Sequence, residues 1–295
     1  MTSISDKIAR RVAERNSWST YSPKTFKDVF KMLRENRPDK TLPNETWLNK
    51  NFPVKNVDWE SLRNYPNSST TKNSIQATWI GHATVFVQMG KFKILTDPIF
   101  SDRCSGVQWA GPKRYRPPAC TLQELIVKEK IGVDVVLISH NHYDHLDYNS
   151  VKELAQLAIS QNQPIEFVVP LGLRKWFEKH IPLSLKGGNK VTELDWHESY
   201  VIRKESNNEM CLSVTPVPMQ HWSNRYGYDR DLTLWCGFSV KAFHENNNSN
   251  NDDGSKSCSF LFTGDTGLFD EATKIGQQYG PFDLAAIPSK FFLSQ

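Results

Sequence analysis

The chain has 295 residues, of which 38% are apolar, enough for one large domain or two small ones with a sizeable core. Its formal charge of +4 is mild and does not predict tight nucleic-acid binding, and its five cysteines, without a Cys-x-x-Cys pair, predict reduced thiols in an intracellular compartment. Residues 1–15 lack the apolar core of a signal peptide and no run approaches about 18 apolar residues, so we expect neither secretion nor a transmembrane helix.

Residues 1–75 are expected to form a partly irregular N-terminal extension, because five prolines interrupt two short helical patterns. One pattern places Phe26, Val29, Phe30 and Leu33 on a single helical face, with basic residues beside it. Such a helix could lie on an anionic bilayer or, as most amphipathic helices do, pack on the protein's own core.

From Ile75 the sequence takes on the pattern of a folded catalytic domain, which we expect to extend over residues 76–295. In chain order the expected elements are strands at 76–80, 84–89, 92–96, 132–138, 166–170, 212–216, 259–263 and 283–287, with helices at 121–130, 151–161 and 173–180. Hairpins are thus mixed with βαβ units, which predicts an α/β fold with a mixed sheet and outer helices. A run rich in Asn, Ser and Asp at 244–257 predicts a flexible insertion.

The segment from His140 to Asp147 reads His-Asn-His-Tyr-Asp-His-Leu-Asp and directly follows the strand predicted at 132–138. Polar side chains of α/β enzymes gather at the carboxyl ends of strands, and His-x-His-x-Asp-His is improbable by chance in a chain with eight histidines. Side chains alternate in an extended segment, so His140 and His142 face one way and His145 the other. The loop could therefore serve two neighbouring metal ions.

Three further residues at predicted strand ends could join this loop. His221 follows the strand at 212–216, Asp265 follows the strand at 259–263, and His82 lies in a tight turn after the first strand. Imidazole and carboxylate groups are zinc ligands, and a catalytic zinc site keeps a position for water. Each residue alone is weak evidence, because a single histidine after a strand more often forms hydrogen bonds than binds a metal.

Together these motifs resemble the metallo-β-lactamase superfamily, and longer blocks resemble one branch of it, the N-acyl-phosphatidylethanolamine-hydrolysing phospholipases D. The matching blocks lie at 78–84, 95–101, 111–114, 137–151, 169–173, 220–222, 264–267 and 280–288. The resemblance spans residues 76–288 and implies an αβ/βα four-layer sandwich.

The resemblance also implies a site with two zinc ions. His140, His142 and His221 are expected to hold one zinc, Asp144 and His145 to belong to the second, and Asp265 to bridge both. A metal-bound hydroxide would attack the phosphodiester of N-acyl-phosphatidylethanolamine and release N-acylethanolamine and phosphatidate. Asp265 and Asp144 are the expected catalytic residues, with Asp265 orienting the hydroxide and accepting its proton.

Other residues are expected to support this chemistry. Tyr143 and Gln220 are the candidates for substrate binding, although the Tyr143 ring could equally pack over the loop. His82, Asp97 and Asp147 are expected to fix the rotamers of the ligands from outside the metal shell.

A phospholipid substrate requires contact with a membrane surface. The loop containing Trp109, Lys113, Arg114, Tyr115 and Arg116 mixes aromatic and basic side chains, as an interfacial contact would, although a solvated loop has the same composition. We therefore expect a peripheral protein on the cytosolic face of a membrane. The resemblance also implies that the protein is a homodimer. No nucleic acid is expected as a partner.

The resemblance breaks off near Pro288, where family members continue through further elements that carry the last histidine ligand of the second zinc. This predicts a C-terminally truncated form, a second half of the sandwich that is incomplete, and a second zinc site that lacks its neutral anchor. We expect one firmly held zinc and reduced turnover. Two alternatives stay open: a related metallo-hydrolase acting on another phosphodiester or a small ester, and an inactive or regulatory isoform.

Overall fold

The computed structural model describes residues 2–22, 43–65, 74–183, 188–204, 210–244 and 257–288. The amphipathic pattern at 26–33 and most of the insertion expected at 244–257 lie outside these described residues.

The first sheet has six strands in the order β1 to β6. Its strands are β1 (Ile75–Gly81), β2 (Thr84–Met89), β3 (Phe92–Thr96), β4 (Val135–Leu137), β5 (Glu166–Pro170) and β6 (Lys190–Leu194). Strands β1 to β3 are antiparallel, and β3 to β6 run parallel. The carboxyl ends of β3 and β4 therefore lie side by side, which is where the parallel part of an α/β sheet places ligands.

The second sheet has five strands in the order β11-β10-β9-β8-β7. They are β7 (Tyr200–Arg203), β8 (Met210–Val217), β9 (Gly237–His244), β10 (Cys258–Phe262) and β11 (Leu284–Ala286). Only β10 and β11 are parallel. The sequence patterns did not predict β6, β7 or β9.

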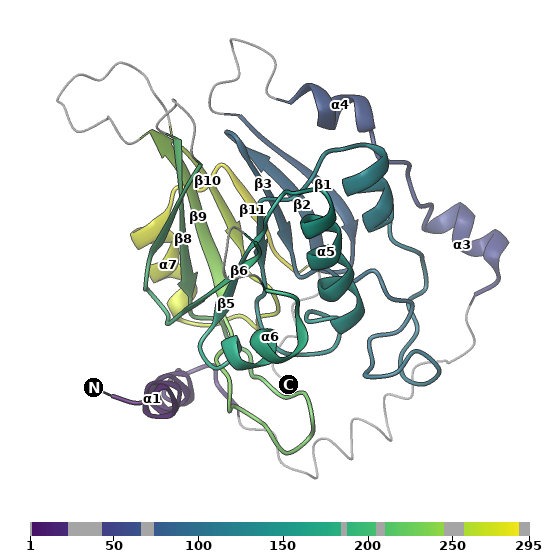
Figure 1. Cartoon of the computed structure of the whole chain (residues 1–295). Coiled ribbons are helices and arrows are strands. Elements are labelled where there is room, and N and C mark those ends of the chain that lie inside the picture. Colours follow the sequence, from purple (N-terminus) through teal and green to yellow (C-terminus); the bar gives the residue numbers. More distant parts are fainter. Residues whose placement is uncertain are drawn as a thin grey trace.

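Helices lie outside the two sheets (Figure 1). The helical elements are α1 (Ile4–Asn16), α3 (Glu45–Asn51), α4 (Trp59–Asn64), a π-helical turn η1 (Glu124–Lys128), α5 (Tyr148–Ser160), α6 (Arg174–His180) and α7 (Glu271–Tyr279). Helix α1 begins at a capping box, in which the Asp6 N–H donates to Ser3 Oγ at 3.1 Å and the Ser3 N–H donates to Asp6 Oδ2 at 3.2 Å. Helices α5 and α6 lie beside the first sheet, and α7 lies beside the second (Figure 1).

Alternate residues of the first sheet enter two separate cores, as the two-residue period of a strand dictates. Val135 and Leu137 pack in a cluster with Phe238 and Phe260 of the second sheet. The intervening Val136 packs in a different cluster with residues of the helices, among them Leu125, Leu154 and Phe177. Two facing sheets with helices outside them form the expected αβ/βα four-layer sandwich, so the fold class is confirmed.

Candidate metal centre

Three loops at one edge of the two sheets supply the candidate metal ligands. His140 to His145 lie in the loop after β4, His221 follows β8, and Asp265 follows β10. The two sheets are joined here, because the Cys236 N–H donates to the main-chain carbonyl of Ser139 at 2.9 Å. The site is therefore anchored to both halves of the sandwich.

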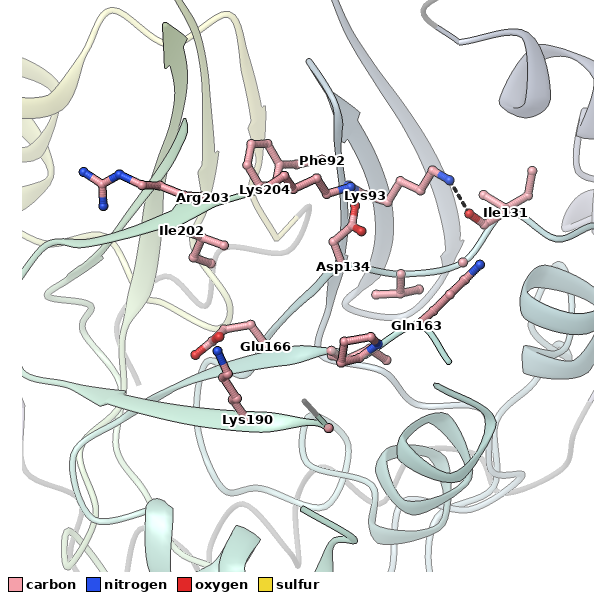
Figure 2. A pocket seen from close by; sticks show the side chains of 15 residues that line it. Phe92, Lys93, Ile131, Asp134, Gln163, Glu166, Lys190, Ile202, Arg203 and Lys204 are labelled. Atoms are coloured by element: carbon pink, nitrogen blue, oxygen red, sulfur yellow. Dashed lines mark hydrogen bonds and ion pairs between the residues drawn. The ribbon is translucent and has the colours of Figure 1, made fainter. Parts of the chain in front are cut away.

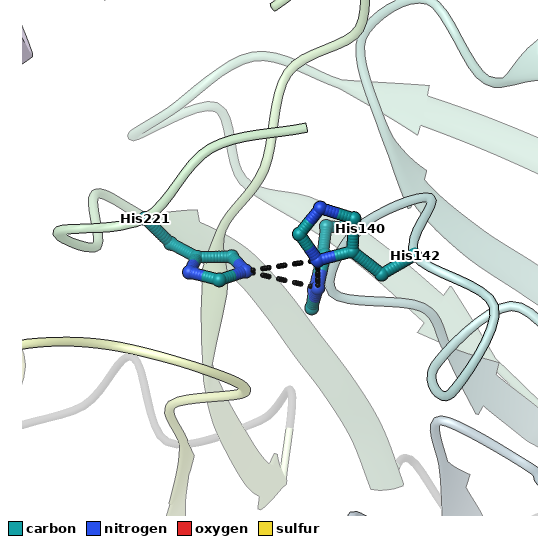
Figure 3. Close-up of side chains that lie close together, drawn as sticks. All are labelled: His140, His142 and His221. Atoms are coloured by element: carbon teal, nitrogen blue, oxygen red, sulfur yellow. Dashed lines mark hydrogen bonds between the residues drawn. The ribbon is translucent and has the colours of Figure 1, made fainter. Parts of the chain in front are cut away.

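Three imidazole rings converge on one point (Figure 3). His140 Nε2 lies 2.8 Å from His142 Nδ1 and 3.1 Å from His221 Nε2, and the third side of the triangle, His221 Nε2 to His142 Nδ1, is 3.2 Å. Zinc–nitrogen bonds of 2.0–2.1 Å in a tetrahedral arrangement place two ligand nitrogens about 3.3 Å apart. This triangle thus has nearly the size that one zinc ion requires.

The protonation of these rings suits metal binding. Burial lowers the pKa of His140 well below its usual value, and the neighbouring histidines lower it further. Burial likewise lowers the pKa of His221 to about 3, against an opposing effect of Asp265. Both rings are neutral at pH 7, and a neutral imidazole is the form that donates a lone pair to a metal.

A second group of ligands lies next to the first. His145 Nε2 is fully buried, has no hydrogen-bond partner among the described residues, and lies 3.4 Å from Asp265 Oδ2 and 3.7 Å from Asp144 Oδ2. His82 Nε2 lies 3.1 Å from the same Asp144 oxygen. Asp265 Oδ2 is also 4.0 Å from His221 Nε2, so this carboxylate stands between the two groups. A buried ring nitrogen without a partner, facing two carboxylates, fits a second cation.

The carboxylates of this group are ionised. Burial alone would raise the pKa of Asp265, but His145 and His221 lower it to about 2. Burial would also raise the pKa of Asp144, and His145 and His82 lower it well below its usual value.

Asp97 orients two of the candidate ligands from the end of β3. Its Oδ2 contacts His145 Nδ1 at 2.6 Å and accepts the Ser139 hydroxyl at 2.6 Å, while its Oδ1 accepts the Ser139 N–H at 2.7 Å. Ser139 Oγ in turn lies 2.9 Å from His140 Nδ1. Because these contacts occupy the Nδ1 atoms, the Nε2 atoms of His140 and His145 face the metal position.

Gly264 allows the two sheets to approach closely at this point. Its φ is +57°, and a Cβ added there would lie 2.6 Å from the Cβ of Ser139. The residue before Asp265 therefore has to be glycine, which sets the position of the Asp265 carboxylate against the β4 loop.

Three other residues expected to support the site, Asp147, Tyr143 and Gln220, form contacts outside the two ligand groups. Asp147 caps helix α5 by accepting the Ser150 N–H at 3.4 Å, so it holds the loop backbone rather than a ligand side chain. Tyr143 packs under Arg225, whose guanidinium carbon is 4.2 Å from the ring centroid. Both polar atoms of the Gln220 side chain bond to Thr20, at 2.6 Å from the Thr20 hydroxyl and 3.3 Å to its carbonyl.

Two buried arginines support the site, and the sequence patterns did not point to either. Arg225 donates to the main-chain carbonyls of Asn141 at 3.0 Å and Leu146 at 2.8 Å, and so closes the loop between them. Arg15 of helix α1 donates to the His221 carbonyl at 2.8 Å. Arginine is charged and mostly exposed in proteins, so a sequence gives no local signal for a buried one.

A family described as "Beta-lactamase superfamily domain" matches residues 93–294. The chain is 36% identical over 285 residues to N-acyl-phosphatidylethanolamine-hydrolyzing phospholipase D 1 of Caenorhabditis elegans, covering 93% of this chain and 71% of that protein. It is 32% identical over 168 residues to the mitochondrial phospholipase D of the same name from Saccharomyces cerevisiae, covering 57% of this chain but only 32% of the yeast protein.

Among solved structures, the metallo hydrolase Igni18 of Ignicoccus hospitalis aligns with a TM-score of 0.44 at 19% identity, covering 70% of this chain and 67% of that one.

Proposed function

Because this chain belongs to the N-acyl-phosphatidylethanolamine-hydrolysing phospholipase D family of the β-lactamase superfamily, we propose that it hydrolyses N-acyl-phosphatidylethanolamine to N-acylethanolamine and phosphatidate with zinc as its metal. The chain is a metal-dependent hydrolase of this superfamily and has candidate His/Asp metal-binding groups. The convergence of His140, His142 and His221 on one point carries the proposal.

The residues present fit two adjacent cations. His140, His142 and His221 would hold one, Asp144 and His145 would hold the other, and Asp265 lies between them. When bound, such a metal pair lowers the pKa of water and neutralises charge on a phosphodiester. A zinc-dependent diesterase needs both functions.

The chain's own side chains supply the remaining steps of the reaction. The side chain of Asp265 is 41% exposed and ionised, so its Oδ2 can accept a hydrogen bond from an attacking water and orient it. Asp144, also ionised and 34% exposed at its side chain, faces the same space. His82 holds the Asp144 oxygen at 3.1 Å and thereby limits its rotamers.

An exposed aromatic loop beside the site supports docking on a membrane. Trp109 is 83% exposed and Tyr115 is 60% exposed. Gly106 of the same loop lies against Tyr143, since a Cβ added there would be 3.2 Å from the Tyr143 hydroxyl. Tryptophan and tyrosine favour the membrane–water interface. We propose that this loop contacts the cytosolic face of a membrane. In the described residues no helix has the length and apolar character needed to cross a membrane.

The proposal is tested by assaying the zinc-loaded chain on vesicles that contain N-acyl-phosphatidylethanolamine. We expect N-acylethanolamine and phosphatidate in equal amounts, loss of turnover with a chelator, and its return with zinc. His142→Ala and Asp265→Asn each change a candidate ligand itself and should lower kcat/KM by about 100-fold or more, since removing only a partner of a ligand already costs about 10- to 100-fold. His244→Ala, at the distant end of β9, is the matched control.

The same assay distinguishes the other candidate functions. Turnover of RNA, a lactam or a thioester in place of the lipid would point to a related hydrolase. Absence of all turnover, together with co-purification of a longer homologous chain, would point to a regulatory form. A homodimer belongs to the proposal as well, and light scattering of the purified protein tests it.

A further inference from the structure

The ring of His142 is held differently from those of His140 and His145. His140 Nδ1 lies 2.9 Å from Ser139 Oγ, and His145 Nδ1 lies 2.6 Å from Asp97 Oδ2. His142 instead presents Nδ1 to the metal position (Figure 3), and its other ring nitrogen, Nε2, is buried with no hydrogen-bond partner among the described residues. A histidine that binds a metal almost always donates its second ring N–H to an oxygen. Because His142 departs from this rule, another group has to orient its ring.

Trp222 is an aromatic neighbour of this ring that is not itself a candidate ligand. The centroids of the His142 and Trp222 rings are 4.7 Å apart, and the two ring planes meet at 73°. In such an edge-to-face pair, the positive edge of one ring meets the negative face of the other. His142 also contacts the rings of His140 and His221, at centroid distances of 4.5 and 5.0 Å, but both of these belong to the triangle of candidate ligands. Trp222 can therefore hold His142 from outside that triangle.

Trp222 is itself held by its loop and by a cation. It follows His221 directly in the chain, and the guanidinium carbon of Arg230 lies 4.9 Å from the centroid of its ring. The Asp231 N–H donates to the Ser223 carbonyl at 2.8 Å. Since Ser223 and Asp231 are the chain neighbours of Trp222 and Arg230, this hydrogen bond brings the two side chains together. The indole is thus a fixed surface for the His142 ring.

Metal binding gives this contact a chemical role. A histidine that binds a metal through Nδ1 carries its ring proton on Nε2, and in His142 this nitrogen is buried. A buried N–H group without an acceptor is unfavourable. The π face of an aromatic ring is a weak acceptor for such a group. An indole beside the His142 ring can therefore replace the oxygen that is missing there.

We propose that Trp222 is a positioning residue for His142, and that its aromatic face does for this ring what an oxygen atom does for His140 and His145. The indole fixes the His142 ring by edge-to-face contact and accepts the Nε2–H, so that Nδ1 points at the metal position. The inference rests on the metal that we propose at His140, His142 and His221, and it holds for any substrate of that metal centre.

The first test measures zinc affinity by competition with a chromophoric chelator. Trp222→Leu keeps an apolar side chain but removes the aromatic face, and it should weaken zinc binding about tenfold or more, as the loss of a partner of a metal ligand does. Trp222→Phe keeps an aromatic face and should stay within about threefold of the wild type. Arg230→Ala removes the cation from the indole and should weaken zinc binding about two- to fivefold.

Phe92→Leu is the matched control. Phe92 is a buried aromatic residue at the start of β3, and the Lys204 ammonium lies 5.5 Å from its ring centroid. It lines a cavity of about 510 Å³ at the end of the first sheet opposite to the metal centre (Figure 2). The substitution thus removes the same kind of ring contact far from the zinc. It should lower the melting temperature and leave zinc affinity unchanged, which separates the role of Trp222 from general destabilisation.

The second test observes the ring proton of His142 by NMR of the zinc-loaded protein labelled with ¹⁵N-histidine. The His142 Nε2–H should exchange slowly with water and lie upfield of the Nδ1–H protons of His140 and His145, because an aromatic ring shields a proton above its face. The signal is identified by its absence in His142→Ala. In Trp222→Leu at saturating zinc the shielding should be lost.

The outcomes distinguish the role of Trp222 from the existence of the metal centre. Wild-type zinc affinity in Trp222→Leu, or an unshielded His142 proton in the wild type, would overturn the positioning role and leave the metal centre intact. Failure of the wild type to bind zinc would overturn the proposed metal centre, and the role of Trp222 with it. Weaker zinc binding by Trp222→Leu but not by Trp222→Phe, together with the upfield proton, supports the positioning role.

Discussion

Arg15 donates a hydrogen bond of 2.8 Å to the main-chain carbonyl of His221, a candidate metal ligand that lies 206 residues later in the chain. The Arg15 side chain is only 3% exposed and also pairs with Asp231 at 3.0 Å. Its guanidinium lies 4.8 Å from the ring centroid of Trp235. The N-terminal helix thus fixes the backbone of the loop that carries His221.

We expect Arg15→Ala to weaken zinc binding about tenfold or more, because His221 would be held less firmly and would bind the metal more weakly. It should also lower the free energy of unfolding by about 3 kcal/mol, since Asp231 loses its buried partner. Zinc affinity is measured by competition with a chromophoric chelator, and stability by urea unfolding. Arg10→Ala, on the exposed face of the same helix, is the control. Unchanged zinc affinity in a folded Arg15→Ala protein would contradict the positioning role.

A second prediction concerns Asp97, which accepts hydrogen bonds from both the N–H and the hydroxyl of Ser139 and contacts His145 Nδ1. Asp97→Asn keeps the shape but replaces one accepting oxygen by a donor. We expect zinc affinity to fall about 10- to 100-fold, the range seen when partners of metal ligands are removed. The exposed Asp102→Asn serves as the control. Equal affinities of the two variants, measured with the same chelator, would show that Asp97 is not needed to orient the ligands.

A third prediction concerns the thiols. Burial raises the pKa of Cys120 to about 12 and that of Cys258 to about 11, and it raises the pKa of Cys236 well above its usual value. Only the thiolate is nucleophilic, so these groups should react with iodoacetamide at pH 8 far more slowly than in urea. Cys104, which is partly exposed, should be alkylated first. Peptide mass spectrometry at timed intervals checks the order, and rapid labelling of Cys236 in the folded protein would contradict it.

The parts of the fold that follow a short-range pattern could be predicted from the sequence. The β10 strand could be found because it contains a short run of apolar residues, Phe260 to Phe262. The motif from His140 to His145 places several candidate ligands in one loop, so their closeness follows from the sequence alone. Strand β9 is not among the predicted strands, although its apolar residues Phe238, Val240 and Ala242 alternate with Ser239 and Lys241 as in a half-buried strand.

Long-range contacts of polar side chains could not be predicted. Gln220 stands next to His221 in the sequence, yet its side chain is engaged by Thr20, 200 residues away. The Arg15 contact with the His221 carbonyl is of the same kind. Such pairs are set by the tertiary fold, and the residues that form them look like ordinary surface residues in a sequence.

The last prediction tests whether the two ligand groups hold separate cations. Zinc should raise the melting temperature of the metal-free protein, because a ligand that binds only the folded state stabilises it. His140→Ala removes a member of the triangle and should lose most of this stabilisation. His82→Ala leaves the triangle intact but frees the Asp144 oxygen that it contacts at 3.1 Å, so it should weaken only the second equivalent of zinc. Titration followed by elemental analysis distinguishes the two equivalents. If His82→Ala lowered the affinity of the first equivalent as much as His140→Ala does, the division into two groups would be wrong.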